Sequence, residues 1–273
     1  MTIAVGFLCT EGVIVAADTC IITQDLKKKE GPKVGAAYTA NGTYAIANAA
    51  DDGNAANALA VKILKDLEQN NYENRGNVEA VVANHMSNWW AGFGQNKPPN
   101  VSFVLGSVIK GTPGIYLCEP PSTVYLHDSY VGVGTGSAQT DPLVSTLFAG
   151  YDVSARIRLW QIAYLFYRAK KDDAFCDGYT TPIFLPLNGG RPMYIAHWEM
   201  KDAEDLGPQF DMYLRELMKN RMTHIDDAKF EEAMNGLTQV MKFISKFVQD
   251  IKFSPLGHDK FTQSDAQTSA GQQ

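Results

Sequence analysis

Cysteine is scarce in this sequence of 273 residues, and its four copies stand far apart: Cys9, Cys20, Cys118 and Cys176. No two of them form a Cys-x-x-Cys pair, and no histidines follow them at zinc-finger spacing. The five histidines are also widely separated and make no ligand motif. We therefore expect reduced thiols, no metal ion and no organic cofactor.

Long hydrophobic runs and positive charge are also missing. No apolar run reaches the roughly 20 residues that span a bilayer, and the segment from Met1 to Gly6 lacks the basic start of a secretory signal. The formal net charge is −6, and no stripe of lysine and arginine alternates with aromatics as in nucleic-acid surfaces. We expect a cytoplasmic protein that binds neither membrane nor nucleic acid.

Short apolar, β-branched runs dominate the first fifty residues and predict two hairpins. The first joins Ile3–Cys9 to Val13–Ala17, and its strands read as buried on both faces. The second joins Val34–Tyr38 to Tyr44–Ala49, with Asn41-Gly42 in a turn where a positive φ costs little. The polar segment between the hairpins, 24–33, is predicted to be a loop.

The pattern then changes to helices, back to strands, and repeats. The predicted order is helices at 53–69 and 78–90, strands at 101–109, 114–118, 124–127 and 130–133, helices at 137–148 and 153–169, and strands at 182–185 and 193–198. Such an order packs as two antiparallel sheets face to face with helices on both outer sides. The fold class is therefore α+β, a four-layer αββα sandwich with a C-terminal helical extension.

The chain divides by composition into three parts. Residues 1–200 form the sandwich domain, and residues 201–253 read as charged amphipathic helix, most clearly at Phe210–Met218 and Phe230–Val248. Residues 254–273 are polar, contain glycine and glutamine, and are predicted to be a disordered tail.

Thr2 is a candidate nucleophile. A threonine at a mature N-terminus carries its own base, because an α-amino group has a pKa near ~8 and is partly neutral at cellular pH. Removal of Met1 would create this terminus, and methionine is generally trimmed before a residue as small as threonine. Taken alone, Thr2 is more simply the second residue of a chain.

Asp18 and Lys33 complete a candidate constellation. The end of the second strand of a tight hairpin lies beside the start of the first, so Asp18 can approach Thr2. Lys33, at the start of the third strand, can pair with Asp18 and favour the ionised threonine oxygen by its positive charge. The plainer alternatives are a turn-forming aspartate and a solvated lysine.

Several motifs in this order resemble proteasome β subunits and the related bacterial ring protease, from Thr2 to Trp198. They are Thr2-Ile3-Ala4-Val5-Gly6, the run Glu11 to Thr19, Lys33-Val34, the run Tyr44 to Asp52, Asn100 to Gly106 with Gly114 to Leu117, Val133 to Ser137, and Asp173 to Cys176. The resemblance implies an N-terminal-nucleophile (Ntn) hydrolase fold.

The resemblance also implies residue roles. Thr2 is the nucleophile, Asp18 and Lys33 tune it, and three further residues support the amino terminus: Thr135, Asp173 and Cys176. The family's oxyanion-hole glycine falls here on Ala47 or Asn48, either of which has a backbone N–H to donate. The loop between Asp18 and Lys33 is one residue shorter than the family pattern, so Lys29 is an alternative to Lys33.

The leading hypothesis is a threonine-type endopeptidase that cleaves peptides or unfolded protein by acyl transfer to Thr2. Its family works in rings, which implies a homo-oligomeric ring here. Two alternatives stay open: a catalytically inactive structural subunit, and an Ntn amidase that acts on a small molecule. Fold alone cannot separate them, because function belongs to the site.

Overall fold

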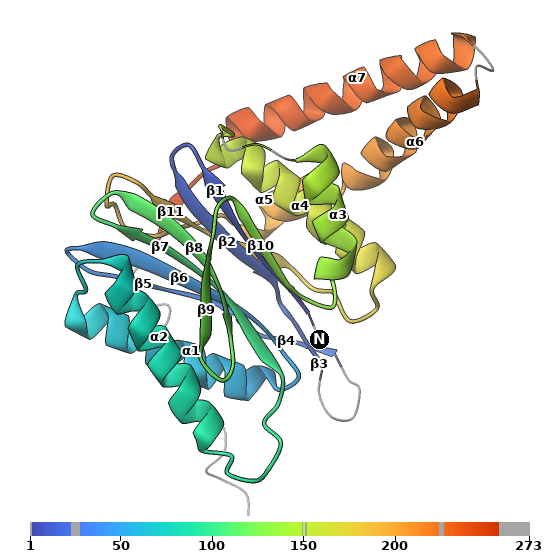
Figure 1. The fold of residues 1–273 in the computed structure, drawn as a ribbon. Coiled ribbons are helices and arrows are strands. Elements are labelled where there is room, and N and C mark those ends of the chain that lie inside the picture. Colours follow the sequence, from blue (N-terminus) through green and yellow to red (C-terminus); the bar gives the residue numbers. More distant parts are fainter. Residues whose placement is uncertain (1, 23–27, 149, 151, 224–226, 257–273) are drawn as a thin grey trace, which may run out of the picture.

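The computed structural model of the chain describes residues 2–22, 28–148, 150, 152–223 and 227–256. Two antiparallel sheets pack face to face, and helices cover both outer faces (Figure 1). This arrangement confirms the four-layer αββα sandwich and the α+β class expected from the order of the elements.

Each sheet combines strands from distant parts of the chain. The first has the order β10-β1-β2-β11-β12-β13, with β1 (Ile3–Cys9), β2 (Gly12–Asp18), β10 (Tyr130–Gly134), β11 (Thr180–Pro186), β12 (Met193–Tyr194) and β13 (Ser254–Pro255). The second has the order β5-β6-β7-β8-β9, with β5 (Val34–Tyr38), β6 (Gly42–Ala50), β7 (Val101–Ile109), β8 (Thr112–Glu119) and β9 (Thr123–His127). A separate short pair joins β3 (Cys20–Ile22) to β4 (Lys28–Glu30).

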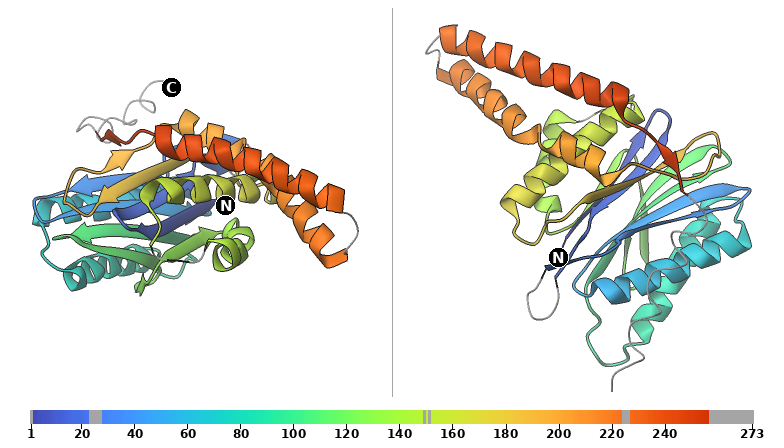
Figure 2. Two further views of the ribbon diagram at one scale, coloured as in Figure 1. Left: turned by 90° about the horizontal axis from the view of Figure 1, so that it is seen from above. Right: turned by 180° about the vertical axis from the view of Figure 1, so that it is seen from behind.

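The helices form the two outer layers. Those on the second sheet are α1 (Gly53–Asn70) and α2 (Arg75–Ala91), and those on the first are α3 (Ser137–Leu147), α4 (Ala155–Asp172) and α5 (His197–Glu204). The last two, α6 (Gly207–Thr223) and α7 (Asp227–Asp250), form a hairpin that starts beside α4 and projects from the sandwich (Figure 2). No helix among the described residues is long and apolar enough to cross a membrane.

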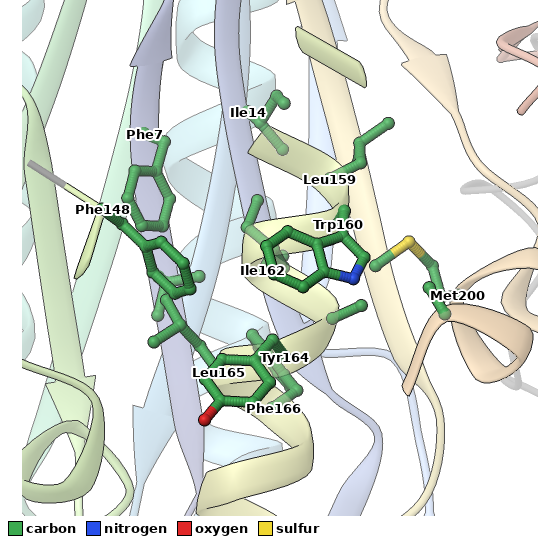
Figure 3. Close-up of a cluster of buried hydrophobic side chains, with 14 of the residues drawn as sticks. Phe7, Ile14, Phe148, Leu159, Trp160, Ile162, Tyr164, Leu165, Phe166 and Met200 are labelled. Carbon is green, nitrogen blue, oxygen red and sulfur yellow. The ribbon is translucent and has the colours of Figure 1, made fainter. Parts of the chain in front are cut away.

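The core has three layers, and side-chain size differs between them. Alanine and valine dominate between the sheets, where Ala4, Val15 and Val104 are fully buried. Large aromatic side chains, including Trp160 and Phe166, fill the layer between the first sheet and α4 (Figure 3). Small side chains between the sheets let the two backbones approach closely, which brings the start of β1 near β5 and β6.

Part of the predicted element pattern is wrong in detail. The segment 24–33, expected to be a loop, contains β4, which pairs with β3. The strand expected at 193–198 ends at Tyr194, and α5 begins at His197. The turn at Asn41-Gly42 is present, but neither residue has a positive φ. There the hydroxyl and N–H of Thr39 both donate to the Gly42 carbonyl.

The domain division at residue 200 falls inside α5. Met200 and Ala203 are both buried in the core of the first sheet, so the sandwich continues through this helix. Ser254 and Pro255, expected in the tail, instead form β13 and pair with β12. Residues 257–273 lie outside the described part of the chain.

Asp52 caps α1, the helix that faces the start of β5. Its carboxylate accepts hydrogen bonds from the N–H groups of Asn54 (3.0 Å) and Ala55 (3.1 Å). We expect Asp52→Ala to lower the free energy of unfolding by ~1 kcal/mol, because both donors lose their acceptor. Lys62→Ala, at an exposed position of the same helix, should change it by less than about 0.5 kcal/mol. Equal losses in urea denaturation would contradict this account of the cap.

Candidate active site

The hairpin of β1 and β2 places Asp18 beside the start of β1. Ala4 pairs with Ala17, so the next position along brings Asp18 opposite Ile3, and the Ile3 N–H donates to Asp18 Oδ1 at 3.3 Å. Thr2 is 2% exposed and Asp18 is fully buried. The register of one short hairpin therefore positions a carboxylate next to the candidate nucleophile, as the sequence predicted.

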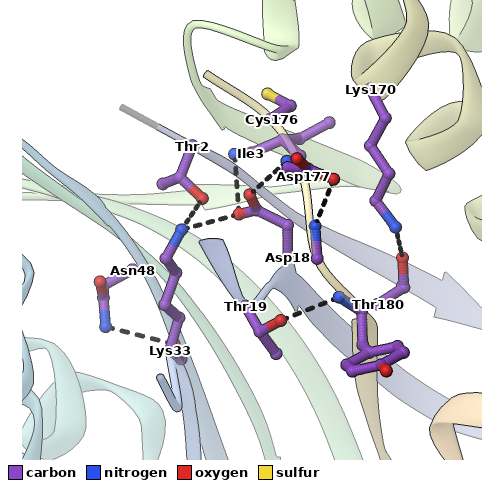
Figure 4. A network of polar contacts seen from close by, with 12 residues as sticks. Thr2, Ile3, Asp18, Thr19, Lys33, Asn48, Lys170, Cys176, Asp177 and Thr180 are labelled. Atoms are coloured by element: carbon purple, nitrogen blue, oxygen red, sulfur yellow. Dashed lines mark hydrogen bonds and ion pairs between the residues drawn. The ribbon is translucent and has the colours of Figure 1, made fainter. Parts of the chain in front are cut away.

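Lys33 joins these two residues from the other sheet. Its ammonium Nζ donates to Asp18 Oδ1 at 2.9 Å and to the Thr2 hydroxyl oxygen (Figure 4). Lys33 is 5% exposed, so the ion pair is shielded from solvent. Lys29, the alternative lysine, lies exposed on β4 opposite Ile21. Lys33 is thus the lysine that meets Thr2 and Asp18.

Burial and the neighbouring donors act in opposite directions on the Asp18 carboxyl of this trio. Burial raises the pKa of the Asp18 carboxyl above its ordinary value. The positive charge of Lys33 and the N–H groups of Asp177 and Ile3 act in the opposite direction, toward a lower pKa. The ionised carboxylate depends on these partners, and in return it fixes the ammonium beside Thr2.

Thr135 lies in a turn that closes over the backbone of Thr2. Gly134 has φ +93°, and a Cβ built on it would lie 2.0 Å from the Thr2 carbonyl oxygen, so only glycine fits there. A Cβ built on Gly136 would lie 2.8 Å from the Cys176 sulfur and 2.9 Å from Ile3 Cβ. Thr135 Oγ1 is buried and makes no hydrogen bond within the described part of the chain.

Asp173 and Cys176 contact each other at the end of α4. The Cys176 thiol donates to Asp173 Oδ2 at 3.7 Å, and the Phe175 N–H donates to Asp173 Oδ1 at 2.8 Å. Burial raises the pKa of Cys176, and the nearby carboxylates of Asp18 and Asp173 add to that rise. A neutral thiol therefore lies beside the turn at Gly136.

Ala47 and Asn48, the expected oxyanion-hole positions, lie on β6 and face different layers. Ala47 is part of the core between the sheets. The Asn48 N–H already donates to the carbonyl of Lys33, the residue just before β5, at 3.0 Å. In this arrangement the Asn48 N–H is therefore not free to bind an oxyanion.

Two cavities adjoin the site. One of about 10 Å³ is lined by Thr2, Lys33 and Asn48 together with Cys20 and Ile21. The other, of about 180 Å³, runs between β5 and α1 and has mainly apolar walls. Among the described residues, no group of three or more histidine, cysteine or acidic side chains could hold a metal ion.

A family model described as Proteasome subunit matches residues 2–140, just over half of the chain. The chain belongs to the proteasome subunit family. This confirms the resemblance on which the site was predicted, and the match includes Thr2, Asp18, Lys33 and Thr135.

Solved structures of Anbu share the fold of this proteasome-family chain at low identity. A Gly-1 mutant of Anbu from Hyphomicrobium sp. strain MC1 is 16% identical with TM-score 0.68, covering 81% of this chain and 100% of its own. The helical assembly of the Anbu complex from Pseudomonas aeruginosa is 14% identical with TM-score 0.70, covering 83% and 99%. Anbu (ancestral beta-subunit) from Yersinia bercovieri is 11% identical with TM-score 0.63, covering 75% and 92%. A search of curated proteins finds no match.

Sequence reasoning missed two residues that hold the proteasome-family site together. The Asp177 N–H donates to Asp18 Oδ2 at 3.3 Å, and the Asp177 carboxylate pairs with Lys28 at 2.8 Å. Asn57, on α1, donates to the Pro32 carbonyl at 2.8 Å, next to Lys33. Asp177 directly follows the Asp173–Cys176 motif, and this position next to predicted site residues could have identified it. Asn57 carried no signal in the sequence.

Proposed function

We propose that this proteasome-family chain is a threonine-type peptidase that cleaves amide bonds with Thr2 after Met1 has been removed. The observation that carries the proposal is the buried contact of Lys33 Nζ with both the Thr2 hydroxyl and Asp18. A nucleophile hydrogen-bonded to a positioned charged group, itself oriented by a third residue, is the general pattern of an activated side chain.

In the proposed reaction, Thr2 Oγ attacks the carbonyl carbon of a peptide bond. The free α-amino group of Thr2 accepts the hydroxyl proton, and Lys33, held by Asp18, stabilises the negative charge that develops on Oγ. The α-amino group then gives the proton to the departing amine, which leaves an ester on Thr2. Water attacks this ester and gives a proton to the α-amino group. The C–Oγ bond then breaks, the α-amino group passes the proton to Thr2 Oγ, and the acid product leaves.

The test is intact mass and N-terminal analysis of the purified protein, with and without a β-lactone or an epoxyketone. We expect the protein to begin at Thr2 and to gain the mass of one inhibitor per chain, located on Thr2 by peptide mapping. Thr2→Ala is the control and should gain no adduct. A folded protein that retains Met1, or that begins at Thr2 and forms no adduct, would rule out the peptidase.

One observation favours a second candidate, an inactive subunit with the same fold. The Asn48 N–H is occupied by the Lys33 carbonyl, and losing one oxyanion donor typically costs 10²–10³ in rate. An inactive subunit would begin at Thr2, or retain Met1, and would react with neither inhibitor. The same mass experiment therefore separates the two candidates.

The proposed substrate is a peptide or unfolded protein, and the proposed setting is a homo-oligomeric ring in the cytoplasm. The four cysteines are free and buried, which suits a reducing compartment. The Anbu structure from Pseudomonas aeruginosa is a helical assembly, which supports self-association of this related fold.

A further inference from the structure

Asn48 stands between the two cavities that adjoin the site. Asn48 and Lys33 are the residues that line both the small cavity at Thr2 and the larger cavity beside α1. Lys33 is needed at Thr2, where its ammonium meets the hydroxyl. Of the two side chains that line both cavities, only that of Asn48 can therefore be shortened while Lys33 stays at Thr2. We call the Asn48 side chain the partition between the cavities.

The orientation of the Asn48 amide follows from its neighbours. Asn57 donates its Nδ2 to the Pro32 carbonyl at 2.8 Å and so turns its own oxygen toward Asn48. Asn48 must then present its Nδ2, which donates to Asn57 Oδ1 at 2.7 Å and to the Lys33 carbonyl at 3.2 Å. Two backbone carbonyls, which can only accept, thus fix which atom of each amide is the donor.

This orientation leaves the oxygen of Asn48 as a buried acceptor. Asn48 is 1% exposed, and Oδ1 makes no hydrogen bond within the described part of the chain. Figure 4 shows this oxygen on the side of the amide away from the Lys33 carbonyl and toward Thr2. Buried polar atoms normally have a partner. An unpartnered acceptor on a residue that lines the cavity of the nucleophile therefore points to a donor on the substrate.

We propose that Asn48 determines substrate choice at this site, and the proposal rests on the proposed function of Thr2. The substrates it favours have a small side chain with a hydrogen-bond donor, such as serine or threonine, next to the carbonyl that Thr2 attacks. The cavity of about 10 Å³ has room only for a small group. Asn48 Oδ1 accepts the hydrogen bond of that group and closes the way to the apolar cavity of about 180 Å³.

The first measurement compares hydrolysis of acetyl-Ala-Ala-Ser and acetyl-Ala-Ala-Leu coumarin amides. The wild type should prefer serine, and Asn48→Ala should raise the leucine-to-serine ratio of kcat/KM at least tenfold, in the range that a few methylene groups usually give. Both substrates are measured with the same enzyme preparation, so the fraction of active enzyme cancels from the ratio of the two kcat/KM values. Asn48→Ser also shortens the partition and keeps a polar group toward Asn57. The same ratio is measured in this variant if Asn48→Ala does not fold.

Val61→Ala is the matched control. Val61 lines the larger cavity and does not line the small one, so this change should leave the ratio as in the wild type. A ratio that is unchanged in both Asn48 variants, or that rises equally in Val61→Ala, would overturn the role of Asn48.

A second measurement separates this inference from the chemistry of Thr2. Binding of the acetyl-Ala-Ala-Ser and acetyl-Ala-Ala-Leu amides is measured by calorimetry in Thr2→Ala, with Asn48 intact and with Asn48→Ala. The expected change from serine to leucine preference would support the inference even if the wild type hydrolysed nothing, which would count only against the proposed function. Binding without this change, or no binding of either peptide, would contradict the inference.

Discussion

Lys33→Ala will abolish the reactivity of Thr2 and destabilise the fold. We expect the rate of β-lactone acylation to fall by ~10³-fold or more, because the nucleophile loses the cation that stabilises its developing charge. We also expect the free energy of unfolding to fall by ~3–5 kcal/mol, because Asp18 is left as an unpaired buried charge. Intact-mass kinetics and urea denaturation measure the two effects.

The stability loss in Lys33→Ala should depend on pH. Burial already raises the pKa of Asp18 above 3.8, and without Lys33 its main opposing influence is gone. A carboxyl with a raised folded-state pKa contributes stability that is present below the unfolded pKa and is lost as pH rises through the folded pKa. The deficit against the wild type should therefore be smallest near pH 4 and grow toward pH 7.

Lys201→Ala is the control for both effects. Its ion pair with Asp205 is exposed, and such pairs contribute about 0–1 kcal/mol. This variant should keep its acylation rate and show no comparable pH-dependent deficit. A Lys33→Ala protein that acylates like Lys201→Ala would contradict the role given to the lysine.

Local pairing explains why part of the site could be predicted. Asp18 approaches Thr2 because β1 and β2 are joined by a tight turn, which fixes the register of the two strands. The position of Lys33 at the start of the next apolar run predicted its pairing with Asp18, and the family resemblance added its role in tuning Thr2. The sandwich itself followed from the order of strands and helices.

Features that depend on distant contacts could not be read from the sequence. The Asn57 side chain, on α1, accepts a hydrogen bond from Asn48 and donates one to the carbonyl of Pro32. The spacing of these residues in the sequence does not predict either contact. The end of β12 at Tyr194 depends on its pairing with Ser254, about sixty residues later. Ala47 and Asn48 were indistinguishable in the sequence, because the strand register decides which N–H faces β5.

Gly134→Ala should damage the site from a position that carries no functional group. The new Cβ would fall 2.0 Å from the Thr2 carbonyl oxygen, at a φ of +93°, so the backbone of Thr2 has to move. A displacement near 1 Å from a reactive geometry can cost ~10²-fold in rate, and we expect at least that loss in β-lactone acylation. The left-handed backbone adds ~1–2 kcal/mol of destabilisation.

Gly189→Ala separates the two parts of this effect. Gly189 also has a positive φ, +73°, but a Cβ there would meet nothing within 4 Å. In urea denaturation, Gly189→Ala should lose a comparable ~1–2 kcal/mol of unfolding free energy from the left-handed backbone. It should react with the β-lactone at the wild-type rate. If Gly134→Ala reacted as fast as Gly189→Ala, the turn at 134–136 would not be what holds Thr2 in place. If both variants lost reactivity, the cause would be general destabilisation and not the contact with Thr2.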